Sequence, residues 1–182
     1  MRRTCSLVAL ALLALVLTVP GADAAGARAH PDHARVHDRT GDAPAPADLV
    51  SGRYAISKRQ AKFTAQVRDL TDTTFLAFEI WPLMDAWDRL AVFKQNGKVV
   101  GRVYFVDNSL EDSNHPVPHL VKCKNLKVHW NAATNTVRVV WPTFCRQASR
   151  PSTHPFEFHV FSRVGGSRHS TGDSLPARTL DF

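Results

Sequence analysis

The sequence lacks most of the motifs by which enzymes and metal proteins are recognised. It contains no G-x-S-x-G, the turn that presents the serine of many hydrolases, and no H-E-x-x-H, the helical pair of zinc ligands. Its 9 histidines are spread along the chain and share no metal-binding spacing. We therefore predict a protein that is not an enzyme, with no catalytic residue, no metal site and no cofactor.

Long apolar runs are also scarce. The one pronounced run, Leu7 to Leu17, is too short for a comfortable membrane span, and no later run is longer. Arg2 and Arg3 precede it and small residues follow it, which is the pattern of a secretory signal peptide. We predict a signal over residues 1–24, a secreted protein and no membrane span in the mature chain. Three cleavage sites stay open, after Ala24, Ala25 or Ala27.

Residues 25–46 contain few apolar side chains and many charged ones, which predicts a flexible leader before a single domain over residues 47–182. The formal net charge is +7, and the signal accounts for +1 of it through Arg2, Arg3 and Asp23. A basic surface permits contact with acidic wall polymers, nucleic acid or anionic lipid. No basic run is interleaved with aromatic residues, so we favour a solvated surface and expect no nucleic acid. We expect a monomer.

No segment keeps a helical period, whereas period-two alternation recurs from Asp48 onward. In Ala61 to Val67, for example, apolar residues alternate with polar ones, and Asn96-Gly97 is a strong hairpin signal. About eight or nine short strands separated by turn residues predict an all-β fold, an antiparallel β-sandwich with a jelly-roll-like arrangement. A closed β-barrel is the alternative fold.

The segment between Cys123 and Cys145 is the clearest hairpin. Residues 126–130 and 137–141 both alternate apolar with other side chains, and an asparagine-rich turn separates them. Folding the hairpin brings the two cysteines together at its open end. The third cysteine, Cys5, lies in the predicted signal, so the mature chain keeps an even number. We predict a Cys123–Cys145 disulfide, with free thiols as the alternative.

These features resemble a group of small secreted β-sandwich proteins of high-GC Gram-positive bacteria. The resemblance rests on the segment that begins Asp48-Leu49-Val50-Ser51, on Arg68-Asp69-Leu70, and on the stretch from Val137 to Pro142 before Cys145. The group is similar in outline to carbohydrate-binding and DOMON-like sandwich modules. It has no assigned activity, so the resemblance implies a fold and no functional residue.

Trp81 and Trp87 flank a short apolar corner and are our candidate ligand-binding residues. An exposed indole face stacks on sugar rings, but both indoles could instead bury their large area in the core, and we favour the second interpretation. Trp130 and Trp141 lie on the apolar faces of their strands and are expected in the core.

One polar loop offers a possible calcium site, although a solvated turn is favoured because the spacing matches no calcium motif. Its oxygen donors are Asp107, Asn108, Glu111 and Asp112. Taken together, the sequence favours a non-catalytic binding or interaction module at the cell surface, with a wall polymer or polysaccharide as its partner. The alternatives are a structural or inhibitory secreted protein without a small-molecule site, and a hydrolase.

Overall fold

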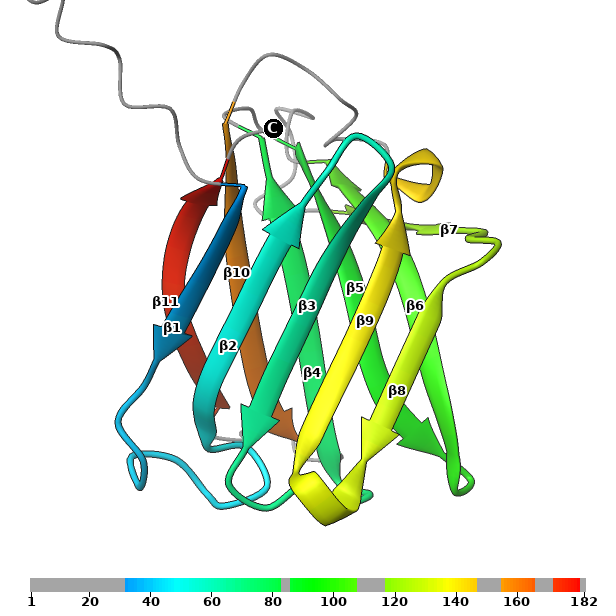
Figure 1. Cartoon of the computed structure of the whole chain (residues 1–182). Helices are drawn as coiled ribbons and strands as arrows, with labels where there is room; N and C mark the ends of the chain where they lie inside the picture. Colours follow the sequence, from blue (N-terminus) through cyan, green and yellow to red (C-terminus); the bar gives the residue numbers. More distant parts are fainter. Residues whose placement is uncertain (1–31, 83–85, 108–116, 147–154, 166–171, 181–182) are drawn as a thin grey trace, which may run out of the picture.

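The computed structural model describes residues 32–82, 86–107, 117–146, 155–165 and 172–180, which form two antiparallel β-sheets packed face to face (Figure 1). The five-stranded sheet has the order β1-β2-β3-β9-β8, and the six-stranded sheet has the order β11-β10-β4-β5-β6-β7. The strands are β1 (His33–His37), β2 (Leu49–Ile56), β3 (Gln60–Val67), β4 (Thr74–Trp81), β5 (Ala86–Gln95), β6 (Lys98–Asp107), β7 (Val117–Val121), β8 (Lys127–Asn131), β9 (Thr136–Pro142), β10 (Phe156–Val164) and β11 (Gly172–Leu180).

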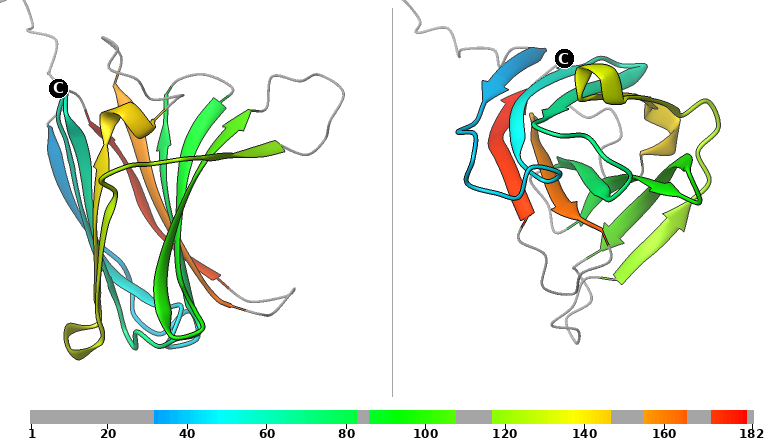
Figure 2. Two further views of the ribbon diagram at one scale, coloured as in Figure 1. Left: turned by 90° about the vertical axis from the view of Figure 1, so that its right-hand side faces the viewer. Right: turned by 90° about the horizontal axis from the view of Figure 1, so that it is seen from below.

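The two sheets form separate layers, as the edge-on view shows (Figure 2). Neither sheet closes on itself, which confirms the predicted β-sandwich over the barrel. The described residues contain eleven strands rather than eight or nine. The helices among them are two single 3-10 turns, η1 (Ala132–Thr134) and η2 (Thr143–Cys145), and neither could span a bilayer.

The core lies between the sheets, because alternate residues of each long strand point inward. The rings of Phe63, Phe78 and Phe158 meet there, with centroids 5.2 Å apart for Phe63–Phe78 and 5.5 Å apart for Phe63–Phe158. Trp141 is fully buried among them, and Trp130 packs partly buried against the same cluster. The predicted positions of these two tryptophans are therefore confirmed.

The predicted hairpin is formed by β8 and β9, joined by η1. Asn135 ends the turn in the left-handed conformation, with φ 52°, which asparagine tolerates better than most residues. Cys123 and Cys145 are bonded at the open end of the hairpin, with an S–S distance of 2.02 Å, as predicted.

The predicted flexible leader is wrong for residues 32–46, because β1 lies within them. β1 pairs with β2 along its whole length and buries Val36, which is 2% exposed. Only Ala34 and Val36 point inward from this strand, between charged and histidine side chains. Two small apolar residues give too weak a pattern to separate an edge strand from a disordered segment of the same composition.

Two further strands, β7 and β11, have weak sequence signals because each contains a proline. β7 includes Pro118 and pairs with β6. β11 begins at Gly172, and Pro176 interrupts its pattern. Both strands lie at the edges of the six-stranded sheet, where a proline is tolerated because one side of the strand needs no hydrogen bonds.

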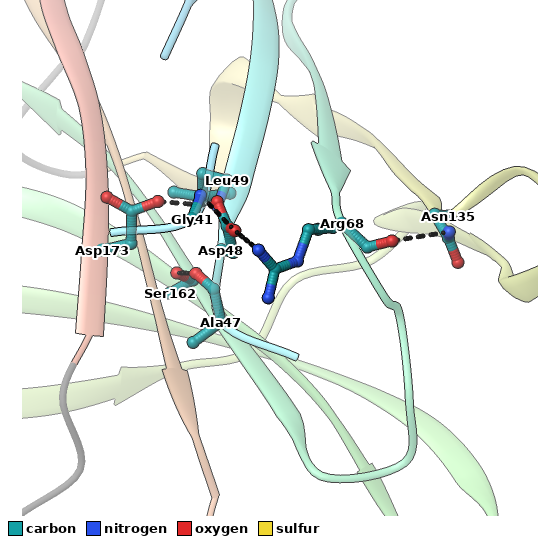
Figure 3. A network of polar contacts seen from close by, with 8 residues as sticks. All are labelled: Gly41, Ala47, Asp48, Leu49, Arg68, Asn135, Ser162 and Asp173. Atoms are coloured by element: carbon teal, nitrogen blue, oxygen red, sulfur yellow. Dashed lines mark hydrogen bonds and ion pairs between the residues drawn. The ribbon is translucent and has the colours of Figure 1, made fainter. Parts of the chain in front are cut away.

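The segment between β1 and β2 is fixed to both sheets by polar contacts (Figure 3). The buried carboxylate of Asp48 accepts a hydrogen bond from the amide of Gly41 at 2.7 Å and pairs with Arg68 at 2.9 Å. Arg68 follows β3, and its carbonyl accepts a hydrogen bond from the side chain of Asn135. These contacts connect the segment to the turn of the disulfide hairpin.

Two further contacts in Figure 3 reach the six-stranded sheet. Asp173 on β11 accepts a hydrogen bond from the amide of Leu49 at 2.6 Å. Ser162 on β10 donates one to the carbonyl of Ala47. Since Ala47 and Asp48 are fully buried, this segment forms a closed end of the sandwich.

Candidate binding surfaces

Trp81 and Trp87 lie on the outer face of the six-stranded sheet, where β4 and β5 meet their connecting corner. Their rings stack at 4.6 Å between centroids and 13° between planes. Neither belongs to the core between the sheets, yet Trp87 is only 8% exposed and Trp81 is half-buried. The structure therefore brings the two predicted residues together, but each indole covers a face of the other.

Polar groups complete this tryptophan cluster, which we define as Trp81, Trp87, Glu79, Arg89 and His159. Glu79 is 1% exposed and accepts hydrogen bonds from Trp81 Nε1, at 2.7 Å, and from Arg89 Nε. His159 packs against Trp81 with ring centroids 5.2 Å apart. A buried carboxylate needs partners of this kind, and because both oxygens of Glu79 are engaged they have little capacity left for a ligand.

The outer face of the five-stranded sheet has a different character, which the sequence analysis missed. Its outward side chains form three rows that run across the strands, because the register places them opposite one another. The basic row is Arg35, Arg53, Thr64, Arg138 and His129. The polar row is His37, Ser51, Gln66, Thr136 and Asn131. The third row is His33, Ala55, Lys62, Val140 and Lys127.

We call these three rows the basic face. It holds five cationic side chains and no carboxylate, and all five are exposed: Arg35, Arg53, Lys62, Lys127 and Arg138. Among the described residues, none of the five makes an ion pair or a side-chain hydrogen bond, and Asp32, which contacts His33, lies just outside the rows. The positive charge of this face is therefore not neutralised within the described fold.

Cations on the opposite sheet are engaged by neighbours. Arg89 binds Glu79, Arg163 lies 4.3 Å from the ring centroid of Phe75, and Arg102 lies 5.3 Å from that of Phe93. Within the described part of this sheet, Lys98 is exposed and makes no such contact, so the two outer faces differ in degree: the five-stranded sheet holds five unpaired cations together.

The basic face is also hollowed. An open depression of about 470 Å³ contains side chains of all three rows. A second depression of about 430 Å³ adjoins it and shares Arg35, Arg53, Lys62 and Thr64 with it. Two adjoining open depressions of this kind fit an extended chain better than a compact small molecule. Compact small molecules are normally bound in deep and mostly apolar pockets.

A sequence signal for this face did exist. Each cation occupies the outward position of an alternating strand; Lys62, for example, lies between buried Ala61 and Phe63. Strand alternation could therefore have placed each charge on a face. What it could not supply was the order of strands, which joins β3 to β9 across a long stretch of sequence.

Three carboxylates gather where β1 ends and β11 begins: the ligand atoms of Asp38, Asp42 and Asp173 lie within 4.8 Å of one another. Burial raises the pKa of Asp173, the amides of Leu49 and Ser174 lower it, and the charges of Asp38 and Asp42 raise it. Both oxygens of Asp173 already accept these backbone hydrogen bonds.

The possible calcium site predicted from the sequence lies in another loop, and of its four ligands only Asp107 is among the described residues.

A second charged group is enclosed near the disulfide. Arg146 is 1% exposed and donates a hydrogen bond to Thr143 Oγ1 at 2.8 Å. Burial lowers the pKa of its guanidinium to about 10, and the nearby charge of buried Asp88 opposes that shift. Both charges are closed to solvent, so we assign this pair to the structure of the fold.

The hydrogen bonds of the described residues include none between a histidine and a serine, threonine or cysteine side chain, the contact that activates most protein nucleophiles. In comparisons with known proteins, the chain matches no family model, no curated protein and no solved structure.

Proposed function

We propose that this protein is a secreted, non-catalytic binding module that attaches to an acidic polymer through the basic face of its five-stranded sheet. The single observation that carries the proposal is a group of five exposed cations that have no ion-pair partner in the described part of the chain and no carboxylate among them. Like charges on neighbouring strands repel, so their accumulation is unfavourable for the isolated fold. Bound anionic groups would remove that repulsion.

Two features support a location at the cell surface. The first residues have the charge and apolar pattern of a secretory signal, and the Cys123–Cys145 bond suits an oxidising compartment. A basic face suits acidic polymers at such a location, because opposite charge accelerates their encounter with the protein.

The tryptophan cluster supports a structural role for Trp81 and Trp87. Their stacked rings and the buried Glu79 form a small packed unit on the outside of the sheet. A neutral glycan bound at half-buried Trp81 and at Phe161, which is 37% exposed, is the second candidate function.

The decisive experiment measures binding of the full chain to acidic polymers at several salt concentrations. The test variant carries Arg35→Gln, Arg53→Gln and Arg138→Gln. A matched control carries Lys98→Gln, Arg102→Gln and Arg163→Gln, which removes the same charge from the six-stranded sheet. We expect the wild type to bind at low salt and to dissociate as salt rises, because exposed charge interactions are screened.

We expect the test variant to bind about tenfold more weakly or worse, and the control to stay within about threefold of the wild type. Equal losses in both variants would show that only net charge matters. The absence of any polyanion binding by the wild type at low salt would remove the proposal.

A further inference from the structure

We infer that the acidic polymer is a polysaccharide, whose charged groups lie on the basic row while its hydroxyl groups contact the polar row. This inference rests on the proposed function and specifies the chemistry of its ligand. Its basis is the arrangement of two chemically different rows side by side in one depression.

The two rows are parallel and close. Residues of neighbouring rows are two positions apart on each strand, which separates the rows by about 7 Å. On β3, Thr64 belongs to the basic row and Gln66 to the polar row, and both line the depression. A single chain lying across the strands would therefore contact both rows at once.

The basic row suits carboxylate or sulfate groups. A guanidinium is planar and can donate two parallel hydrogen bonds to such an anion. Arg35 and Arg53 are direct cross-strand partners, and Arg138 follows after Thr64 on the far side of β3. The three guanidinium groups are thus distributed across β1, β2 and β9, as a polymer with repeated charges would require.

The polar row offers neutral hydrogen-bonding groups beside the charged side chains of the basic row. Ser51 Oγ donates to Gln66 Oε1 at 3.2 Å, which orients the Gln66 side chain. The Gln66 amide N–H donors have no partner among the residues that the structure describes. Thr136 lies beside Gln66 on β9. A polyphosphate has no hydroxyl groups for such partners, whereas every sugar unit of an acidic polysaccharide has several.

Other polyanions fit this face less well. Single-stranded nucleic acid is held by stacking of bases on aromatic side chains, and none of the three rows contains a phenylalanine, tyrosine or tryptophan. A lipid surface is normally bound by protruding apolar side chains together with cations. The apolar members of the rows, Ala55 and Val140, are short and half-buried.

The test compares polygalacturonate, which has carboxylates and hydroxyls, with inorganic polyphosphate, which has charge alone, and with neutral dextran. A polar-row variant carries Gln66→Val and Thr136→Val, both compatible with a strand. Gln60→Val on the same strand, outside the three rows, is its control, and thermal unfolding checks that all variants are folded. Single-stranded DNA is included as a competing polyanion.

We expect tighter binding of polygalacturonate than of polyphosphate or single-stranded DNA, and none of dextran. The polar-row variant should lose about fivefold or more in affinity for polygalacturonate, with polyphosphate binding changed less than about twofold. Equal binding of polygalacturonate and polyphosphate, unaffected by the polar-row changes, would overturn the inference while leaving the proposed function intact. Failure of every polyanion to bind would overturn both, and preference for DNA would assign the face to nucleic acid.

Discussion

Arg35 and Arg53 lie directly opposite each other on β1 and β2, on the side of the sheet that carries no carboxylate. Like charges at directly opposed strand positions destabilise a sheet. The fold therefore contains an unfavourable pair in a place where a neutral strand-forming residue would be better for stability. Such a conflict is typical of positions kept for binding.

The first prediction follows from this pair. Arg53→Thr should increase the free energy of unfolding by about 0.2–1 kcal/mol at low salt, because it removes the repulsion and introduces a good strand former. Urea unfolding at low and high salt measures the effect, which should shrink as salt screens the charges. Arg53→Lys keeps the charge and serves as the control. A stability loss in Arg53→Thr at low salt would contradict the repulsion argument.

The second prediction concerns the disulfide. Cys123 and Cys145 are 22 residues apart, and closing a loop of this size stabilises a fold by about 3 kcal/mol in the chain-entropy model. The double variant Cys123→Ala and Cys145→Ala should lose stability of this order in urea unfolding. Reductant should destabilise the wild type but not the variant. Mass spectrometry of non-reduced peptides gives an independent check, and two alkylatable thiols in the native secreted protein would disprove the bond.

The third prediction is a pH dependence at Asp173. Because its pKa is raised in the folded protein, mainly by burial, this carboxyl favours the fold when protonated. That contribution is fully present below the ordinary pKa of 3.8 and is lost as pH rises through the raised value. The stability of Asp173→Asn relative to wild type should therefore increase from acidic to neutral pH. Thermal unfolding across this range tests it.

Asp69→Asn is the matched control for this measurement, since Asp69 is exposed and its side chain makes no hydrogen bond or ion pair among the described residues. Its pH profile gives the baseline against which the Asp173→Asn difference is measured. An Asp173→Asn difference that does not exceed this baseline would show that the charge on Asp173 does not affect the fold.

The fourth prediction separates structure from binding in the tryptophan cluster. Trp87→Ala should cost about 3–5 kcal/mol, as for a buried tryptophan, because Trp87 is 8% exposed. Trp81→Ala removes the stacking partner from a half-buried site and should cost less. Both variants should keep wild-type affinity for polygalacturonate under conditions where they are folded. Loss of glycan binding by folded Trp81→Ala would favour the second candidate function.

The sequence predicted the sheets well where apolar residues alternate strongly. The alternating run from Ala61 to Val67 predicted β3 directly, and its apolar residues are buried. The hairpin of β8 and β9 was equally clear, because two alternating runs and two cysteines agreed. In each case one strand or one hairpin contained the whole signal.

Features that depend on distant pairing were not predictable in this way. β1 has only two small inward residues, and its strand character comes from hydrogen bonding to β2. The burial of Trp87 outside the core was not predictable from the strand pattern, because it comes from stacking on Trp81 and not from the opposite sheet. The basic face required the order and register of five strands, since β3 and β9, which join its two halves, are far apart in sequence.

Proteolytic removal of β1 would change which strand forms the edge of the five-stranded sheet. β1 pairs with one edge of β2, and β3 pairs with the other. A protease that removed the residues before Leu49 would take Arg35 away and leave a row of unsatisfied backbone donors and acceptors along β2. An exposed strand edge of this kind pairs readily with another copy of itself. β1 is itself a short edge strand with charged and histidine side chains, so its loss would exchange a short edge for the longer edge of β2. Shortened forms should therefore associate more readily than the full chain.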